Sequence, residues 1–288
     1  MILSMTAFAR REASLAAGVL AWELRSVNSR YLEVAVRLPE ELRGVEMRAR
    51  ELIAGRLGRG KVEAGLRMQA VAAAGAPLEL DEGVLRQLLD AAAAVQRLSG
   101  SAEPLRAIDY LRWPGAVRAT PLDMEGLASA ALALLDEALE ELVAMRTREG
   151  ERLAGLIRQR LDAMRAIVSQ VRAIVPETVA AHRERLKARL AEVRQELDAN
   201  RLEQEIVLFA TRSDVAEELD RLATHIEEVG GALKRGGQVG RRLDFLMQEF
   251  NREANTLGSK AVDIRMTNAA VELKVLIEQM REQVQNIE

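Results

Sequence analysis

The sequence predicts an α+β protein, with a small N-terminal mixed sheet and a covering helix, followed by a long all-α half of coiled-coil-like antiparallel helices. Apolar residues alternate with others over residues 32–38, which indicates a half-buried strand. From residue 157 onward, apolar residues recur at alternating intervals of four and three, which is typical of narrow-seamed helices. We place the domain boundary between residues 150 and 151.

The first 72 residues contain strand-like segments on both sides of one helix-like segment. After the turn-like pair Asn28-Ser29, the alternation indicates a strand that ends at Pro39. Residues 40–57 carry apolar side chains at helical spacing, and a Gly-Arg-Gly sequence ends that helix. Alternation then returns until Met68. Together with two strands before residue 28, these segments predict the order β-β-β-α-β.

The chain is expected to be almost entirely helical from Leu122 onward. An Ala/Gly/Pro linker at residues 72–77 leads to an earlier helix from about residue 81 to residue 98, and Trp113 is expected to anchor a loop in the core. Narrow apolar seams bury little area alone, so the helices should pair within the chain or between subunits. The seams are Ile157–Val175, Leu186–Leu197 after Pro176, Val215–Leu233, Leu243–Leu257 and Ala270–Ile287.

Charge is segregated along these helices, although the net charge is only −3. Residues 146–189 hold eleven Lys or Arg against five Asp or Glu, whereas residues 190–229 hold four against eleven. This asymmetry indicates electrostatic pairing between helices or a basic surface beside an acidic one, with solvated helix faces as the simpler interpretation. The low net charge argues against general coating of nucleic acid, so a polyanion site must be a local concentration of Arg and Lys.

Several classes of protein are excluded by what the sequence lacks. It has no cysteine, and therefore no disulfide, thiolate metal site or cysteine nucleophile. It also lacks the P-loop, the dinucleotide-binding GxGxxG, the HExxH zinc motif and the GxSxG hydrolase motif. The N-terminus does not resemble a secretory signal, and no apolar run approaches the roughly 20 residues that span a bilayer. We therefore expect a cytoplasmic protein with no membrane partner.

A charged stripe beside the third seam is the first candidate site. Asp214, Glu218, Arg221, His225 and Glu228 follow each other at intervals of four, three, four and three, which places them on one helix face. Acids and an imidazole together suit a divalent metal, since carboxylates favour Mg²⁺ or Mn²⁺ and the imidazole favours Mn²⁺ or a later transition metal. Spacing alone favours the simpler interpretation, in which Arg221 forms ion pairs with its acidic neighbours.

The fourth seam is flanked by a second polar group. Glu249 and Glu253 lie one helical turn apart, and like charges at that spacing destabilise a helix unless a cation or base lies between them. Asn251 and Asn255 are weak helix formers, which points to a function, although a polar layer that fixes helix register is the alternative. We predict a catalytic divalent-metal site, Mn²⁺ or Mg²⁺, formed by Glu218, His225, Glu249 and Glu253.

Cations in both halves are predicted to bind an RNA backbone. Arg25 and Arg30 lie on either side of a turn, next to Tyr31, which can stack on a base. Lys61 follows a glycine where backbone amides can approach a phosphate. The remaining predicted RNA-binding residues are Arg241, Arg242, Arg252 and Lys260. The simpler interpretation is that arginine-rich hairpins are common on protein surfaces.

The longest of these segments resemble a known family. Residues 4–10, 23–33 and 59–63 resemble the N-terminal signature of the YicC/YloC family. Residues 214–222, 248–257 and 272–288 are similar to its C-terminal signature, so the resemblance covers the whole chain. Many members carry His or Gln where this chain has Ser29, so a required imidazole is not expected at that position.

The resemblance implies a bacterial cytoplasmic endoribonuclease that cleaves single-stranded RNA with a divalent metal, Mn²⁺ in particular. It also implies a homohexamer that opens to enclose RNA, and a role in RNA turnover that includes small regulatory RNAs. Two alternatives stay open. One is a non-catalytic RNA-binding adaptor that delivers RNA to a separate exoribonuclease, and the other is a coiled-coil scaffold that does not bind RNA.

Overall fold

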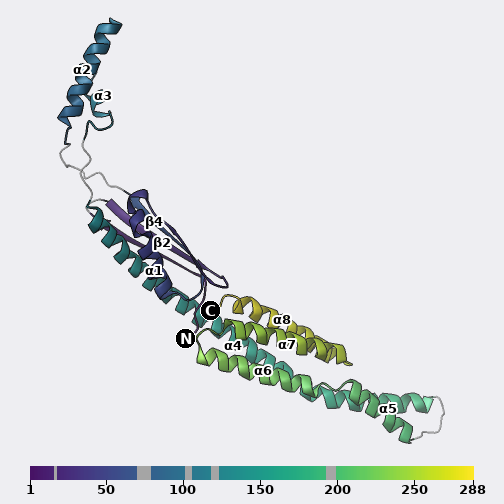
Figure 1. Cartoon of the computed structure of the whole chain (residues 1–288). Coiled ribbons are helices and arrows are strands. Elements are labelled where there is room, and N and C mark those ends of the chain that lie inside the picture. Colours follow the sequence, from purple (N-terminus) through teal and green to yellow (C-terminus); the bar gives the residue numbers. More distant parts are fainter. Residues whose placement is uncertain (16–17, 70–78, 101–105, 118–122, 193–198) are drawn as a thin grey trace.

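We describe the protein from a computed structural model, which covers residues 1–15, 18–69, 79–100, 106–117, 123–192 and 199–288. The molecule is elongated, with a sheet between two sets of helices (Figure 1). A four-stranded sheet forms the N-terminal part and most of the remainder is helical, which confirms the predicted α+β class. The linker predicted at residues 72–77 lies outside the described residues.

The N-terminal elements are β1 (Ala7–Leu15), β2 (Gly18–Val27), β3 (Leu32–Arg37), η1 (Glu40–Val45), α1 (Glu46–Arg56) and β4 (Gly60–Gln69). They confirm the predicted order of three strands, a helix and a strand. The order within the sheet is β1-β2-β4-β3. β1 and β4 both pair antiparallel with β2, whereas β3 pairs parallel with β4. A parallel pair needs a crossover connection, which η1 and α1 provide.

Helices cover one face of this sheet. α1 and the first half of α4 (Met124–Glu192) pack against the inward side chains of the strands. Trp22 is fully buried in this core, and its indole N–H donates to the backbone oxygen of Ala131 at 2.8 Å. This hydrogen bond satisfies the only polar atom of a large apolar side chain. Side chains on the opposite face of the sheet, such as Arg25 and Glu63, are exposed.

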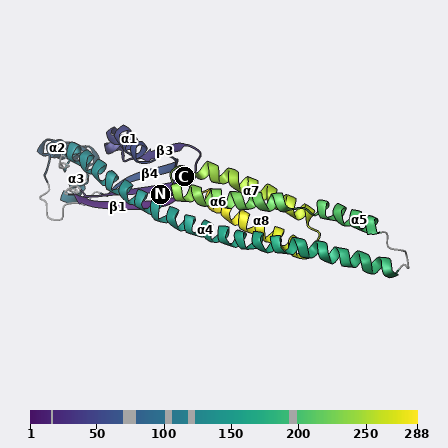
Figure 2. The same ribbon diagram turned by 90° about the horizontal axis from the view of Figure 1, so that it is seen from below.

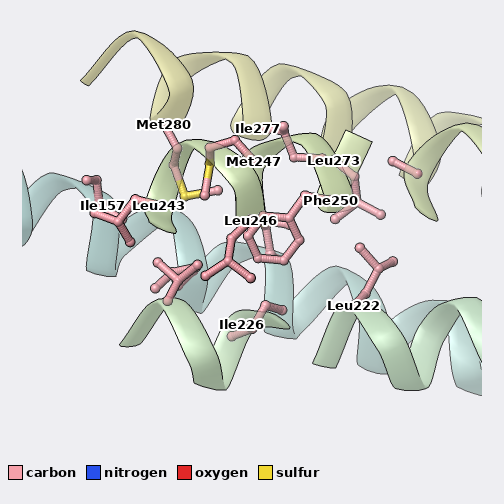
Figure 3. Packing of buried hydrophobic residues seen from close by; sticks show 14 of the residues in the cluster. Ile157, Leu222, Ile226, Leu243, Leu246, Met247, Phe250, Leu273, Ile277 and Met280 are labelled. Carbon is pink, nitrogen blue, oxygen red and sulfur yellow. The ribbon is translucent and has the colours of Figure 1, made fainter. Parts of the chain in front are cut away.

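A second core lies in a bundle of α6 (Ala216–Arg235), α7 (Gly240–Lys260), α8 (Ile264–Val284) and the second half of α4. Figure 3 shows side chains of these helices meeting in one apolar layer around Phe250. Every residue of the three seams predicted between Val215 and Ile287 is buried. The helices therefore pair within the chain, which is one of the two arrangements that the pattern allowed.

α4 is a single helix of 69 residues that contributes to both cores. Its residues up to Leu142 pack on the sheet, and those from Leu153 pack in the bundle. The helix continues through Pro176, although the sequence pattern separates two runs there. The later part of the second run, from Val193 to Leu197, lies outside the described residues. The domain boundary at residue 150 falls inside α4 and stays a prediction.

In the structure, basic side chains of α4 pair with acidic side chains of α6. Arg165 donates to Glu227, and Arg172 donates to Asp220. A third ion pair, between Arg183 and Glu203, joins α4 to α5 (Ala199–Arg212). Exposed pairs contribute little stability, about 0.5 kcal/mol each. Electrostatic pairing between helices, one of the predicted alternatives, is thus confirmed.

α2 (Glu82–Ser99) and α3 (Ala107–Leu111) project beyond the end of the sheet that lies away from the bundle (Figures 1 and 2). α2 matches the helix predicted for residues 81–98, and the Asp81 carboxylate caps it by accepting from two backbone N–H groups. The expectation that Trp113 anchors a loop in the core is wrong, since this side chain is 58% exposed. Neither projecting helix has a buried residue that could form such a core. Within the described ranges, no helix is long and apolar enough to cross a membrane.

Candidate functional site

The four predicted catalytic residues lie on two neighbouring helices of the bundle. Glu218 and His225 belong to α6, and Glu249 and Glu253 belong to α7. Figure 3 shows the apolar seams of the two helices facing each other, with Phe250 of α7 close to α6. Glu218 and Glu253 are buried. A carboxylate is rarely buried without a partner, so each of these two requires a nearby donor or cation.

Arg221 is the partner of Glu253. Its Nη1 donates to Oε1 of Glu253 at 3.3 Å, and the Glu253 side chain is only 3% exposed. The same guanidinium pairs with Glu217, one turn earlier on α6. The pKa of Arg221 is raised, mainly by its hydrogen bond to Glu253 and secondly by its hydrogen bond to Glu217. The expected ion pairing of Arg221 is present, although its partners are not the acids of its own stripe.

Lys260 is the partner of Glu218. Its Nζ donates to Oε1 of Glu218 at 2.8 Å and so joins the end of α7 to the beginning of α6. The second carboxylate oxygen, Oε2, is buried and has no hydrogen-bond partner in the described part of the chain. A buried oxygen of this kind can accept one further hydrogen bond or a proton. Glu218 therefore has capacity for chemistry that its ion pair does not use.

His225 lies two turns after Glu218 on the same helix. Its Nδ1 is buried without a hydrogen-bond partner among the described residues, and its ring meets Phe250 edge-on with 6.0 Å between centroids. Glu249 is partly exposed and lies one turn before Glu253 on α7. His225 and Glu249 thus add an imidazole and a carboxylate to the two cation-held acids.

These groups do not form a metal cluster within one chain. Among the described residues, no three acidic or histidine side chains lie close enough to share a metal ion. Glu218 and His225 are separated by about 10 Å along the axis of α6, and the guanidinium of Arg221 pairs with Glu253. The four predicted ligands therefore do not fit a single ion in this arrangement, and we assign no step to a metal. The dependence on a divalent metal stays a prediction.

The predicted RNA-binding cations form two separate groups. Near the sheet, the Arg30 guanidinium lies over the Tyr31 ring at 5.4 Å, while Lys61 pairs with Glu63 at 3.8 Å. The α7 group extends along about 28 Å of helix. Within it, Lys260 is already committed to an acid of the bundle. The sheet group is Arg25, Arg30 and Lys61, and the α7 group is Arg241, Arg242, Arg252 and Lys260.

A hollow of about 680 Å³ lies on the open face of the sheet, lined by all four strands. Sequence reasoning found Arg25 but missed this hollow and the two other cations that line it, Arg37 and Arg67. The pairing of β3 with β4 brings Arg37 level with Gly65, which has no side chain to fill the space. No feature of the sequence pattern specifies that pairing.

A buried guanidinium connects the sheet to the bundle, and sequence reasoning missed it as well. Arg146 of α4 is 1% exposed. Its Nε donates to the backbone oxygen of Ser4 at 2.6 Å, and its Nη2 donates to the backbone oxygen of Arg59 and to Oε2 of Glu288, both at 3.1 Å. Burial lowers the pKa of Arg146, and the charge of Glu288 opposes this shift.

Two signals in the sequence could have identified Arg146. It follows Leu142 by four residues, so it occupies a position of the apolar seam that begins at Leu135 and Leu139. A charge in an apolar seam predicts a buried partner. Gly150, one turn later, is the second signal, because glycine is unfavourable inside a helix. The structure gives the reason for it, since a Cβ there would lie 2.1 Å from the backbone oxygen of Ile2.

Comparison with known proteins identifies the family. A family model described as "Endoribonuclease YicC-like, N-terminal region" matches residues 2–155, and "Endoribonuclease YicC-like, C-terminal" matches residues 171–288. The chain belongs to the YicC-like endoribonuclease family. It is 47% identical over 288 residues to "Probable endoribonuclease YicC" of Haemophilus influenzae, and 31% identical over 293 residues to the protein of the same name from Clostridioides difficile. Both alignments cover 100% of this chain and of the relative.

The YicC-like signature segments come together at two places in this structure. Residues 4–10, 59–63 and 272–288 supply the acceptors of Arg146 through Ser4, Arg59 and Glu288. Residues 214–222 and 248–257 supply the carboxylates that pair across α6 and α7. The segments that carry the family resemblance therefore lie at the contacts of Arg146 and at the paired acids of α6 and α7.

Proposed function

We propose that this protein is an endoribonuclease that cuts single-stranded RNA internally. The observation that carries the proposal is the match of YicC-like endoribonuclease models to residues 2–155 and 171–288. Relatives that are named probable endoribonucleases align with the chain over 100% of their length. The acids and cations of α6 and α7 support it further, because cleaving a phosphodiester needs proton transfer beside a bound polyanion.

The reactive groups in this proposal are the polar side chains of the α6–α7 face. RNA cleavage needs a base that takes a proton from the attacking oxygen, an acid that protonates the leaving oxygen, and positive charge near the phosphate. Glu218 and His225 each have a buried atom without a hydrogen-bond partner in the described chain, which suits proton transfer. Lys260 and Arg221 supply positive charge next to them.

A divalent ion, Mn²⁺ or Mg²⁺, is part of the proposal as a separate requirement. Bound near the scissile phosphate, such an ion would neutralise developing charge and activate water. The side chains of one chain do not provide a three-ligand cluster for it in the described residues. Metal dependence is therefore tested by adding and removing the ion rather than by mutating presumed ligands.

The direct test uses a circular single-stranded RNA, which an exoribonuclease cannot degrade. Purified protein is expected to convert the circle first to a linear product and then to shorter pieces. EDTA should stop the reaction, and Mn²⁺ should restore it. A circle that stays intact under every metal condition would refute the endoribonuclease, whereas cutting in EDTA would refute only the metal requirement.

Substitutions then test the reactive groups. Glu218→Gln and Glu249→Gln are expected to slow cutting by at least about 100-fold, the usual range for loss of a general acid or base. Glu272→Gln is the matched control, because Glu272 is an exposed glutamate of α8. Circular dichroism checks that the helical content is unchanged. Cutting at the rate of the unmodified protein in both variants would remove the α6–α7 face from the mechanism.

A non-catalytic RNA-binding adaptor is the second candidate. The observation that favours it is that Glu218 and Glu253 already have cationic partners, as in ion pairs that only stabilise a fold. An adaptor would bind the circular RNA without cutting it. It would accelerate degradation of a linear RNA only when a separate exoribonuclease is present.

We also propose a cytoplasmic homohexamer that takes part in RNA turnover, including that of small regulatory RNAs. Exposed apolar side chains on α7 and α8 support self-association, since such patches often mark interfaces. They are Phe245, Ile264, Val271 and Val275. Light scattering is expected to give the mass of six chains, and a monomer at micromolar concentration would contradict the hexamer.

A further inference from the structure

The open face of the sheet carries charged side chains that the strand register aligns in rows. Strand register places Phe8 of β1 opposite Arg25 of β2, and Arg25 opposite Glu63 of β4. The next row along the strands contains Glu23 and Gly65. Directly paired side chains lie about 5 Å apart at their Cβ atoms, so each row forms one continuous strip across the sheet.

Gly65 forms the floor of the hollow on this face. A Cβ built on Gly65 would meet no atom within 4 Å, so the space above it is open. Arg37 of β3 is its neighbour in the same row. The hollow, of about 680 Å³, therefore lies between charged side chains on adjacent strands, and it is within the usual size range of a small-ligand site.

The charges around the hollow leave a positive excess. Glu23 has two basic neighbours, Arg10 at 3.8 Å and Arg67 at 3.7 Å. Glu63 has Lys61 at 3.8 Å. Both acids of the hollow are thus compensated. Arg25 and Arg37, which also line it, have no ion-pair partner within the ranges that the structure describes, so they are available to an anion.

Phe8 adds an aromatic ring to these cations. It is 50% exposed and lines the hollow next to Arg25. Covering an exposed phenyl ring is favourable, and the unpaired arginines beside it attract an anion, so a ligand that is both flat and anionic fits this face. A nucleotide has these two properties, because its base stacks on an aromatic ring and its phosphate pairs with a guanidinium.

We propose that this hollow binds a nucleotide segment of single-stranded RNA, with a base stacked on Phe8 and backbone phosphates held by Arg25 and Arg37. The choice of RNA as the ligand rests on the proposed function, and the new element is the set of residues that bind it. The two arginines are about 12 Å apart at their Cα atoms, so they flank the hollow. A duplex is excluded as the ligand because its bases are stacked inside the helix and cannot reach Phe8.

The test measures binding of a fluorescent 2′-O-methyl RNA oligonucleotide in EDTA, conditions chosen to prevent cleavage. Phe8→Ala is expected to weaken binding about 10-fold through loss of stacking. The double variant Arg25→Ala/Arg37→Ala should reduce the slope of log affinity against log salt by about 1.4, since each phosphate contact to a single strand contributes about 0.7. A duplex of the same sequence should bind more weakly and be insensitive to Phe8→Ala.

A second variant fills the hollow without changing any charge. Gly65→Leu places a side chain where the structure has open space, and is expected to weaken binding about as much as Phe8→Ala. Gly55→Leu is the matched control, because a Cβ at this exposed glycine of α1 also meets no atom within 4 Å. Arg43→Ala is the control for charge, since Arg43 is an exposed residue of η1. Fluorescence of Trp22, measured in a Trp113→Phe background, checks that each variant has a folded sheet.

The outcomes separate this site from the proposed function. Suppose that the protein binds the oligonucleotide, loses binding in the Phe8 and Gly65 variants, and never cuts circular RNA. The binding site is then supported and the endoribonuclease activity is refuted. If it cuts circular RNA but all three variants bind as tightly as the unmodified protein, the site falls. A change of oligomeric mass in Phe8→Ala with unchanged RNA affinity would overturn the site and make this face a contact between copies.

Discussion

Arg146→Met is the substitution with the largest expected effect on stability. Methionine keeps much of the side-chain volume but removes every donor of the guanidinium. Three acceptors then lose their partner, namely the buried backbone oxygen of Ser4, the part-buried backbone oxygen of Arg59 and the buried carboxylate of Glu288. Each of these acceptors belongs to a different segment, so one change loosens three contacts between the sheet and the bundle.

The expected cost follows from the burial of this pair. Removing one partner of a buried ion pair costs about 3–5 kcal/mol. The Arg146 and Glu288 side chains are 1% and 9% exposed, so solvent offers little compensation. We expect a loss of about 4 kcal/mol in the free energy of unfolding. Adding Glu288→Gln neutralises the orphaned carboxylate, and the double variant should regain about 2 kcal/mol.

Urea unfolding measures this effect with two probes. In a Trp113→Phe background, tryptophan fluorescence follows the sheet, because Trp22 is buried there, and circular dichroism follows the helices. The two transitions should coincide in the unmodified protein and separate in Arg146→Met, where α4 still joins the halves but the Arg146 contacts that couple their unfolding are lost. Arg148→Met, at an exposed position of α4, is the control. A loss below about 1 kcal/mol, or a double variant no more stable than Arg146→Met, would refute the reasoning.

Three further predictions concern other contacts. Hydrogen bonds from Arg265 lower the pKa of Asp263 from 3.8 to about 2, so its stabilising effect is complete above pH 4 and is lost as the pH falls through 2. Asp263→Asn should remove this acid-dependent step from thermal melts between pH 2 and pH 5. Lys260→Met should destabilise the protein by about 2 kcal/mol in urea, because Glu218 stays buried without its cation, and adding Glu218→Gln should recover part of the loss. Gly65→Val should raise stability by about 0.5 kcal/mol, since glycine weakens a strand interior, and a lower melting temperature would contradict this.

Much of the fold could be predicted because the relevant signals are local. Alternation between Leu32 and Leu38 reports one buried face, and the seams from Val215 onward report one buried stripe, without knowledge of the partner. Pro176 was harder to interpret, since proline in a helix interior costs about 3 kcal/mol. That cost is outweighed here because the seam residues on its N-terminal side, such as Val171, are buried in the bundle. The exposure of Trp113 had no local signal, because the projection of α2 and α3 is a property of the whole fold.

The candidate site was predictable only in part, for a related reason. Spacing places Glu218 and His225 on one helix, and Glu249 and Glu253 on another. It does not give the register between the two helices, which decides that Arg221 reaches Glu253 and that Lys260 reaches Glu218. The hollow on the sheet depends in the same way on strand pairing.

The continuity of α4 determines how the protein can be divided. The helix is about 100 Å long from end to end, and the interval between the two family matches, residues 156–170, lies in its middle. A fragment that begins after this interval would lack the α4 residues from Leu153 to Val168, which pack in the core of the bundle, whereas the sheet would keep its own part of α4. The interval between the two family matches therefore does not coincide with a break between the two cores, because one continuous helix belongs to both.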